Sequence, residues 1–407
     1  MEVTARGFAT AAGEAVTCTV LLLSLLAAGQ DSAAVPPAGS PASPVTPKTV
    51  TQAPRSDYIG DDACSSCHHD KTEAFQHTAH YLTSRLPKAD SILGDFAPNA
   101  NILKTSNPEL FFKMDARDDG FFQTSFQGMS PYITSRSECF GLVVGSGEKG
   151  QTYAFWKGDL LFQLPVSYWK ELGWVNSPGY RDGIANFDRP TTPRCLECHA
   201  TYFESLSPPP NRYSKAGFVV GITCEKCHGP GRVHAQLYGS KTARPANPAI
   251  LNPARFSRDR QTDLCAWCHA GHGTPLLPSF SYTSGEPLAR YLDLPQPDPA
   301  AAMDVHGSQV ELLQRSLCYQ SSGMTCLTCH DVHVTQHDVA EFRKVCLSCH
   351  KPQTPRFPKD HRAASDCVDC HMPAQETNLI VFDWNGKKVK PRVRSHWIKV
   401  YGQKLQQ

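Results

Sequence analysis

The sequence has little of what marks a nucleic-acid-binding or membrane-spanning protein. Its 40 Lys and Arg residues do not gather into the basic blocks that bind nucleic acid, and the formal net charge is only +2. The longest mostly apolar run, residues 15–28, spans 14 positions, whereas a membrane-spanning helix needs about 20. We therefore expect no nucleic-acid partner and no transmembrane span beyond a leader.

What the sequence does contain is seven copies of one short motif, C-x-x-C-H. Residues i and i+3 of a helical turn face the same way, so both thiols can form thioethers to the vinyl groups of one haem. The adjoining histidine can then bind the iron as proximal ligand. Zinc sites and disulfides also use paired cysteines, but neither requires a histidine after every pair. The pattern predicts seven covalently bound haem c groups.

We number the haems 1 to 7 in chain order. The predicted attachment cysteines are Cys64 and Cys67, Cys195 and Cys198, Cys224 and Cys227, Cys265 and Cys268, Cys326 and Cys329, Cys346 and Cys349, and Cys367 and Cys370. The predicted proximal ligands are His68, His199, His228, His269, His330, His350 and His371.

Ten histidines remain after the proximal set, whereas only five methionines follow Met1. Histidine is therefore the expected sixth iron ligand of most haems, which leaves low-spin iron with no open position. The candidate distal ligands are His80, His234, His306, His333, His361 and His396. His77 is an alternative to His80 on the same helix, and His69 is expected on the surface. Seven irons need seven ligands, so His77, His272 or His337 completes the set, or one haem has an open face.

The N-terminal part predicts export. Residues 1–29 have a weakly basic start at Arg6, an apolar core and small residues at Ala27–Gly29, as in a signal peptide. An uncleaved N-terminal anchor is the alternative. Residues 30–56 are rich in Pro, Ala and Ser and predict a disordered linker. Since haem attachment to apocytochrome c takes place outside the cytoplasm, we expect a periplasmic or otherwise extracytoplasmic protein.

The folded part is expected in three segments: residues 57–92 around haem 1, a β-rich insert at 93–190, and haems 2–7 at 191–407. Short apolar segments separated by turn residues predict strands at 109–114, 121–127, 140–144, 151–156 and 160–166. These would form a small antiparallel β-meander subdomain between haems 1 and 2. With 32 Pro and 28 Gly, the remainder predicts short helices and turns. The expected fold class is mainly α, with extensive irregular loops around a haem-organised core.

Three cysteines belong to no haem motif, and since Cys18 lies in the expected leader, only Cys139 and Cys318 are unassigned in the mature chain. In an oxidising compartment they could form a disulfide between the β subdomain and the helix before haem 5. Two buried thiols are the other interpretation.

At these motifs the sequence resembles multihaem cytochromes of the cytochrome c-552/4 (c-554) type, relatives of the multihaem nitrite reductases and hydroxylamine oxidoreductases. The resemblance covers roughly residues 58–84 and 191–400. It is carried by YIGDDACSSCHHDKTEAFQHTAH, CEKCHGPGRVHA, MTCLTCHDVH, CVDCHMP and the closing SHW. It implies that the six candidate histidines are distal ligands. No C-x-x-C-K occurs, which departs from the lysine-ligated haem of the nitrite reductases and argues against ammonia-forming nitrite reduction.

These observations favour an electron-transfer protein that uses closely packed, mostly bis-histidine haems to connect redox partners. The expected partners are a quinol dehydrogenase, other cytochromes or a terminal reductase. One alternative is a haem oxidoreductase that acts on a small nitrogen or sulfur compound at a five-coordinate haem. Another is a haem-bearing subunit of a larger respiratory complex. The sequence assigns no catalytic residue.

Overall fold

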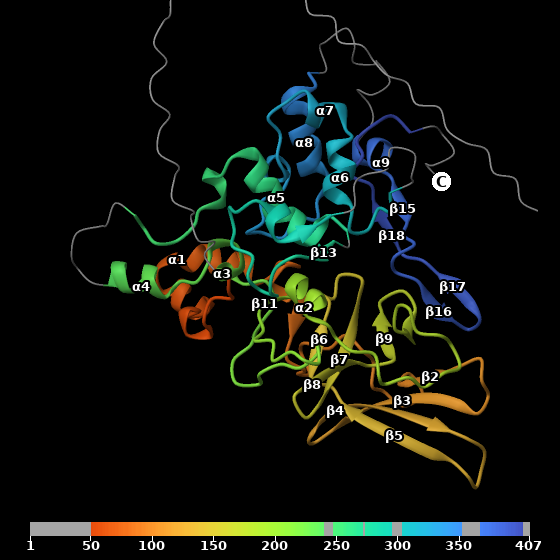
Figure 1. Ribbon diagram of the computed structural model, residues 1–407. Coiled ribbons are helices and arrows are strands. Elements are labelled where there is room, and N and C mark those ends of the chain that lie inside the picture. Colours follow the sequence, from red (N-terminus) through yellow and green to blue (C-terminus); the bar gives the residue numbers. More distant parts are fainter. Residues whose placement is uncertain (1–49, 240–246, 272, 295–302, 352–366, 402–407) are drawn as a thin grey trace, which may run out of the picture. The chain divides into compact units, whose positions relative to one another are not determined.

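The computed structural model describes residues 50–239, 247–271, 273–294, 303–351 and 367–401 (Figure 1). These residues belong to one compact unit, Thr49–Gln407. The expected leader at 1–29, and the expected linker apart from residues 50–56, lie outside the described residues. Within the described ranges, no helix is long and apolar enough to cross a membrane.

The helices are short, and seven of those described hold all or part of a haem motif. These are α1 Asp61–Phe75, α2 Pro193–His199, α3 Cys224–His228, α5 Arg258–His269, the 3-10 helix η5 Cys326–Thr328, α8 Val339–Cys349 and α9 Cys367–His371. The other helices are α4 Arg232–Gly239, α6 Gln309–Gln314, α7 Leu317–Gln320, η1 Arg55–Asp57, η2 Tyr81–Thr83, η3 Pro253–Arg255 and η4 Leu288–Arg290.

The motif itself limits helix length. Helices α2, α3, α5 and α9 each end at the proximal histidine. In α3 the next residue, Gly229, has φ 81°, a left-handed conformation that suits glycine after a helix end. Helix α1 continues past its motif but has non-helical angles at His68, φ −119° and ψ 41°. One helical turn presents both thiols, so the motif requires no longer helix.

Most strands lie between haems 1 and 2, drawn in orange to yellow-green in Figure 1. A four-stranded antiparallel sheet has the order β2-β3-β4-β5. A six-stranded sheet has the order β1-β6-β7-β9-β10, with β8 paired to β7. The bounds are β1 Ser84–Arg85, β2 Ile102–Lys104, β3 Leu110–Arg117, β4 Gly120–Gln127, β5 Thr134–Cys139, β6 Leu142–Val144, β7 Gly150–Lys157, β8 Leu160–Gln163, β9 Val166–Trp169 and β10 Gly173–Asn176.

Four two-stranded antiparallel ribbons lie among the haem motifs. They are β11 Ala200–Tyr202 with β12 Val219–Val220, β13 Thr274–Pro275 with β14 Leu292–Asp293, β15 Ala374–Glu376 with β18 Arg392–Arg394, and β16 Phe382–Trp384 with β17 Lys387–Val389.

The expected mainly-α fold is wrong. Of the described residues, 27% are helical and 24% are strand, in many small antiparallel sheets. The single β-meander is also too simple, because β7 pairs with β6, β8 and β9. Two physical reasons explain the difference. The haem helices end within a turn or two, and the loops between them pair as ribbons. Strand β5 is a polar, largely exposed edge strand without the apolar alternation that predicts strands.

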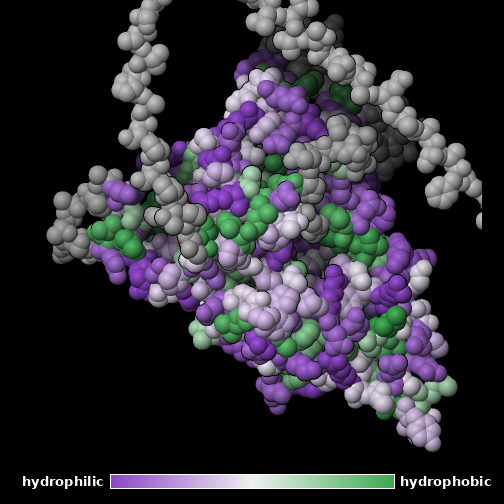
Figure 2. Space-filling view, viewed as in Figure 1, coloured by the Kyte–Doolittle hydropathy of each residue, from purple (hydrophilic) through white to green (hydrophobic). Residues whose placement is uncertain are grey.

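The core of the β-rich region follows the two-residue period of strands. On β3, Leu110, Phe112 and Met114 are at most 2% exposed and pack with Tyr153 and Phe155 of β7. The alternate residues of β3 point away from this core. On the face that Figure 2 shows, hydrophobic residues lie in separate groups among hydrophilic ones.

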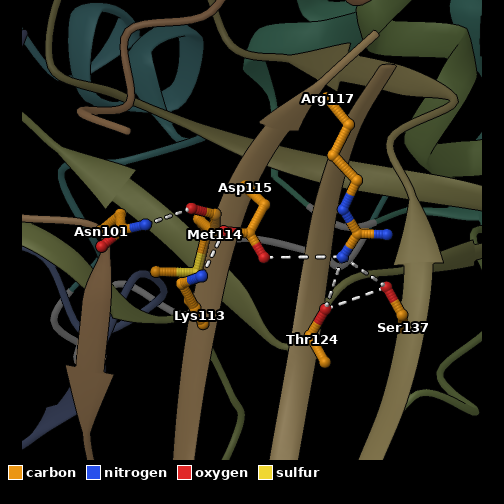
Figure 3. Close-up of polar contacts among 7 residues, drawn as sticks. All are labelled: Asn101, Lys113, Met114, Asp115, Arg117, Thr124 and Ser137. Atoms are coloured by element: carbon orange, nitrogen blue, oxygen red, sulfur yellow. Dashed lines mark hydrogen bonds and ion pairs between the residues drawn. The ribbon is translucent and has the colours of Figure 1, made fainter. Parts of the chain in front are cut away.

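The other face of β3 and β4 carries a group of polar side chains around Arg117 (Figure 3), together with the stacked rings of Phe111 and Phe126. The Asp115 carboxylate lies 2.8 Å from Lys113 and 3.5 Å from Arg117. The Arg117 guanidinium donates to the hydroxyls of Thr124 and Ser137 at 3.4 Å each, and Thr124 donates to Ser137 at 2.9 Å. These half-exposed ion pairs contribute little to stability, so the buried apolar face holds this sheet.

We predict that Phe112→Ala lowers the free energy of unfolding by about 3–5 kcal/mol, because it leaves a cavity in a fully buried site. Tyr132→Ala is the matched control. Tyr132 is 85% exposed, and its loss should change stability by at most about 0.5 kcal/mol. Guanidinium unfolding followed by far-ultraviolet circular dichroism measures both. Equal stability of the two variants would contradict this assignment of the core.

Candidate haem-binding site

A large cavity runs among the haem motifs. Its volume is about 2840 Å³, several times the roughly 300–1,000 Å³ of a pocket for one small ligand. The proximal histidines of haems 1 to 6 and both thiols of haems 1, 3, 4, 5 and 6 line it. The cavity therefore has the size and the donor groups for several haems rather than one.

Four proximal histidines each face a second histidine ring at nearly the same distance. Two imidazoles that bind one metal from opposite sides, each through a bond of about 2 Å, have ring centres about 6 Å apart. The observed ring-centre distances are 6.4 Å for His68 and His234, 6.2 Å for His228 and His333, 6.1 Å for His269 and His80, and 6.3 Å for His330 and His396. The residues therefore fit an iron between each pair of rings.

The structure places the other candidate ligands as follows. His306 lines the cavity and is an electrostatic neighbour of His199 and His269. His361 and the alternative His272 lie outside the described residues.

Two histidines fit a distal role less well. His77 does not line the cavity, whereas His80 does. His69 is exposed, with its side chain 72% accessible and 3.7 Å from Glu73, as expected of a surface residue. The remaining alternative, His337, lines the cavity with its ring 3.9 Å from the carboxylate of Glu148.

Several rings are oriented through their Nδ1 atoms. The Nδ1 atoms of His228, His234 and His371 lie 2.7–2.9 Å from the backbone carbonyls of residues 251, 248 and 399. An imidazole that donates from Nδ1 keeps Nε2 unprotonated for a metal. Burial also lowers the pKa of His269 and that of His396 to about 4. Both rings are therefore neutral at pH 7, the form that binds iron.

Thiols of different motifs meet in pairs. The neighbouring thiols are Cys64 and Cys224, Cys198 and Cys268, Cys265 and Cys326, and Cys346 and Cys367. Electrostatic neighbours add Cys227 beside Cys265 and Cys329 beside Cys346. The attachment sites are thus adjacent in the order 1-3-4-5-6-7, with site 2 beside site 4.

A buried carboxylate inside the haem 3 motif connects attachment sites 1 and 3. Glu225, between the cysteines of haem 3, is 3% exposed. Its carboxylate accepts hydrogen bonds from the backbone N–H groups of Ile59 and Gly60 at 2.9 Å and of Gly231 at 2.8 Å. The start of α1 is thereby tied to the haem 3 motif. Sequence reasoning missed Glu225, although a charged residue inside a motif was a usable signal.

Glu197, in the haem 2 motif, is a second buried carboxylate. It is 1% exposed, accepts from the Phe280 backbone N–H at 2.6 Å and lies 3.6 Å from Arg194. Burial raises the pKa of this carboxyl above its ordinary value. This residue, too, was missed from the sequence, and it fixes the haem 2 motif to the loop after haem 4.

Comparison with known proteins agrees with this site. Residues 179–229, which hold the haem 2 and haem 3 motifs, match the family described as cytochrome c554 and c-prime. The chain is 22% identical over 384 residues to dissimilatory sulfite reductase MccA of Wolinella succinogenes. The chain is a multihaem c-type cytochrome. The alignment covers 78% of this cytochrome but only 50% of the length of the relative.

A solved structure titled outer cell wall cytochrome OcwA is also similar. The structural alignment covers 84% of this cytochrome and 80% of the other chain, with 19% sequence identity and a TM-score of 0.49. Such a weak likeness supports no statement about activity.

The two spare thiols form no bridge. Cys139, in β5, and Cys318, in α7, are both free cysteines in the structure. Cys139 is exposed and Cys318 half-buried, so neither the disulfide nor a pair of buried thiols describes them.

We predict that Glu225→Ala lowers the free energy of unfolding by about 2–4 kcal/mol, since it leaves three enclosed backbone N–H groups without their charged acceptor. The matched control is Glu73→Ala, at a carboxylate whose side chain is 69% accessible. Denaturant unfolding of the holoprotein compares them. If E225A is as stable as E73A, the carboxylate does not hold the two segments together.

Proposed function

We propose that this cytochrome carries seven haems c and passes electrons between redox partner proteins outside the cytoplasm. The observation that supports this best is the set of paired imidazole rings at 6.1–6.4 Å. An iron bound on both faces has no position for a substrate, which suits electron transfer rather than catalysis. When bound, each haem supplies a one-electron iron couple.

The ring pairs support specific ligand assignments. His234 would serve haem 1, His333 haem 3, His80 haem 4 and His396 haem 5. For haem 2 the electrostatic proximity of His306 to His199 supports the same role. His361, assigned from the sequence alone, would serve a haem that neighbours haem 7, because it lies too close to Cys367 to reach around the same ring. His80 thus binds the iron of haem 4, although its own segment carries haem 1.

The order of the attachment sites supports conduction across the molecule. Thiol contacts connect sites 1, 3, 4, 5, 6 and 7 in a row, with site 2 as a side branch at site 4. On this order, haem 1 would lie at one end of the row and haem 7 at the other. Electrons from a quinol dehydrogenase or another cytochrome would enter at one end and reach a second cytochrome or a terminal reductase.

Export rests on the sequence. The signal-peptide pattern of residues 1–29 and the extracytoplasmic site of haem attachment together support a periplasmic or otherwise extracytoplasmic location.

A second candidate function comes from the name of the relative MccA, a dissimilatory sulfite reductase. On this alternative, one haem with an open position would reduce a small sulfur compound. A high-spin signal in the paramagnetic resonance of the oxidised protein, with sulfite-dependent oxidation of the reduced protein, would favour it. Low-spin signals alone, without sulfite turnover, would favour electron transfer.

We predict a mass equal to that of the mature chain plus seven haems after expression with a cytochrome c maturation system. The same mass spectrum gives the first residue of the mature chain, so it also tests removal of the leader. A mass with fewer than six haems, or with zinc in their place, would contradict the proposed cofactor content.

We predict that His80→Ala, His234→Ala, His333→Ala and His396→Ala each convert one low-spin haem to high-spin, because each removes one of two axial ligands. All haems should stay attached, since the thioethers are unchanged. His69→Ala and His77→Ala are controls and should leave every haem low-spin. Paramagnetic resonance gives the spin state and mass spectrometry the haem count. A distal variant with an unchanged spectrum would show that its assignment is wrong.

A further inference from the structure

Positive charge is concentrated at the C-terminal end of the described chain. Residues 374–401 hold six basic side chains, Lys387, Lys388, Lys390, Arg392, Arg394 and Lys399, and two acidic ones, Glu376 and Asp383. The segment therefore has a net charge of +4, whereas the whole polypeptide has only +2. The rest of the chain is net negative, so the protein is electrostatically polar.

The β16–β17 hairpin presents part of this charge on a fixed support. Its turn residues Asn385 and Gly386 have φ 50° and 70°, as in the two-residue turns of tight hairpins. On β16, Phe382 is 1% exposed and packs on the Trp169 ring, with ring centres 4.9 Å apart. The Asp383 backbone carbonyl accepts from the Asn176 side chain at 2.6 Å. The hairpin is therefore anchored through β16.

The basic strand β17 and the residues after it face outward. Lys387, Lys388 and Arg392 are exposed, and Lys390 is half-buried. We call these four residues the C-terminal basic surface. The ion pair of Lys388 with Asp383, at 3.0 Å, has a lysine side chain that is 63% accessible, so it neutralises little of the local field. A partner in solution can approach these charges directly.

This surface is connected to the haem 7 motif. Strand β15, which follows that motif, pairs with β18, with Glu376 opposite Arg392 and Ala374 opposite Arg394. The Arg394 guanidinium pairs with Asp369, next to Cys370. The backbone carbonyl of Lys399 lies 2.9 Å from Nδ1 of proximal His371. The basic segment thus contacts the motif at the end of the row of attachment sites.

We propose that the C-terminal basic surface docks a redox protein with an acidic face, and that electrons are exchanged with it at haem 7. This inference rests on the proposed electron-transfer function. Redox partners form small, transient complexes, and complementary charge raises their association rate by about 10–1,000-fold at low ionic strength. A fixed basic hairpin that is joined to the terminal haem motif through the β15–β18 ribbon fits that requirement.

An anionic membrane is the competing partner for a basic surface. Interfacial binding also needs apolar side chains that enter the lipid. In the described part of 374–401 the large exposed hydrophobics are Leu379 at 45% and Val400 at 82%, neither of them on the hairpin. Trp384 packs against the β-rich core instead of facing outward. The surface therefore favours an acidic protein.

The test is stopped-flow reduction of the oxidised holoprotein by flavodoxin hydroquinone, a small acidic redox protein. One variant carries Lys387→Glu, Lys388→Glu and Lys390→Glu. The matched control carries Lys88→Glu, Lys104→Glu and Lys157→Glu, three exposed lysines elsewhere with the same change in net charge. Dithionite reduction of each protein, and sedimentation with phosphatidylserine-containing vesicles, are measured alongside.

We expect the wild-type bimolecular rate constant to fall by about tenfold or more as salt rises, and the hairpin variant to be about tenfold slower at low salt. The control should differ from wild type by less than about twofold, and dithionite should reduce all three proteins equally. Equal slowing of both variants, or slowing of neither, would overturn the docking surface. So would vesicle binding that only the hairpin variant loses. Failure of dithionite to reduce the haems would instead count against the proposed function itself.

Discussion

The structure depends on pairs of imidazole rings that come from distant parts of the chain and meet across one cavity. Proximal His68 of haem 1 meets His234, which lies on the helix after haem 3. Proximal His228 of haem 3 meets His333, which comes three residues after proximal His330. Each iron would therefore connect two segments that the polypeptide alone holds only by short helices and ribbons. This explains how so little regular secondary structure can enclose a cavity of about 2840 Å³.

Protein–protein packing supplies the rest of the support, mainly around haem 2. Leu196 of α2 and Ala200 of β11 are at most 1% exposed and pack in one cluster with Leu142 of β6 and Leu161 of β8. The Ser84 hydroxyl donates to the His199 carbonyl at 2.5 Å. The β-rich region is thus the support against which the haem 2 motif packs.

Local chemistry was predictable from the sequence, but pairing across the fold was not. The C-x-x-C-H motif identifies a haem attachment site because its five adjacent residues supply both thiols and the proximal histidine. Strands β3, β4 and β7 were predicted because each is a short apolar segment bounded by turn residues. The partner of His80 could not be predicted, since nothing near His80 in the sequence indicates His269. The mainly-α expectation failed because the ribbons β11–β12 and β15–β18 are only two or three residues long, too short for a periodic signal.

The position of His396 has a consequence for how the protein matures. Thioether formation needs only a five-residue motif, so haems can be attached one at a time. Closing the second axial bond is different, because it must wait for the segment that brings the partner ring. On the proposed assignments, haem 4 would find His80 early, since that residue precedes it. Haem 5 would have to wait for His396, which follows its motif. Its iron would therefore become low-spin only after the segment that holds His396 has folded back onto the haem 5 motif.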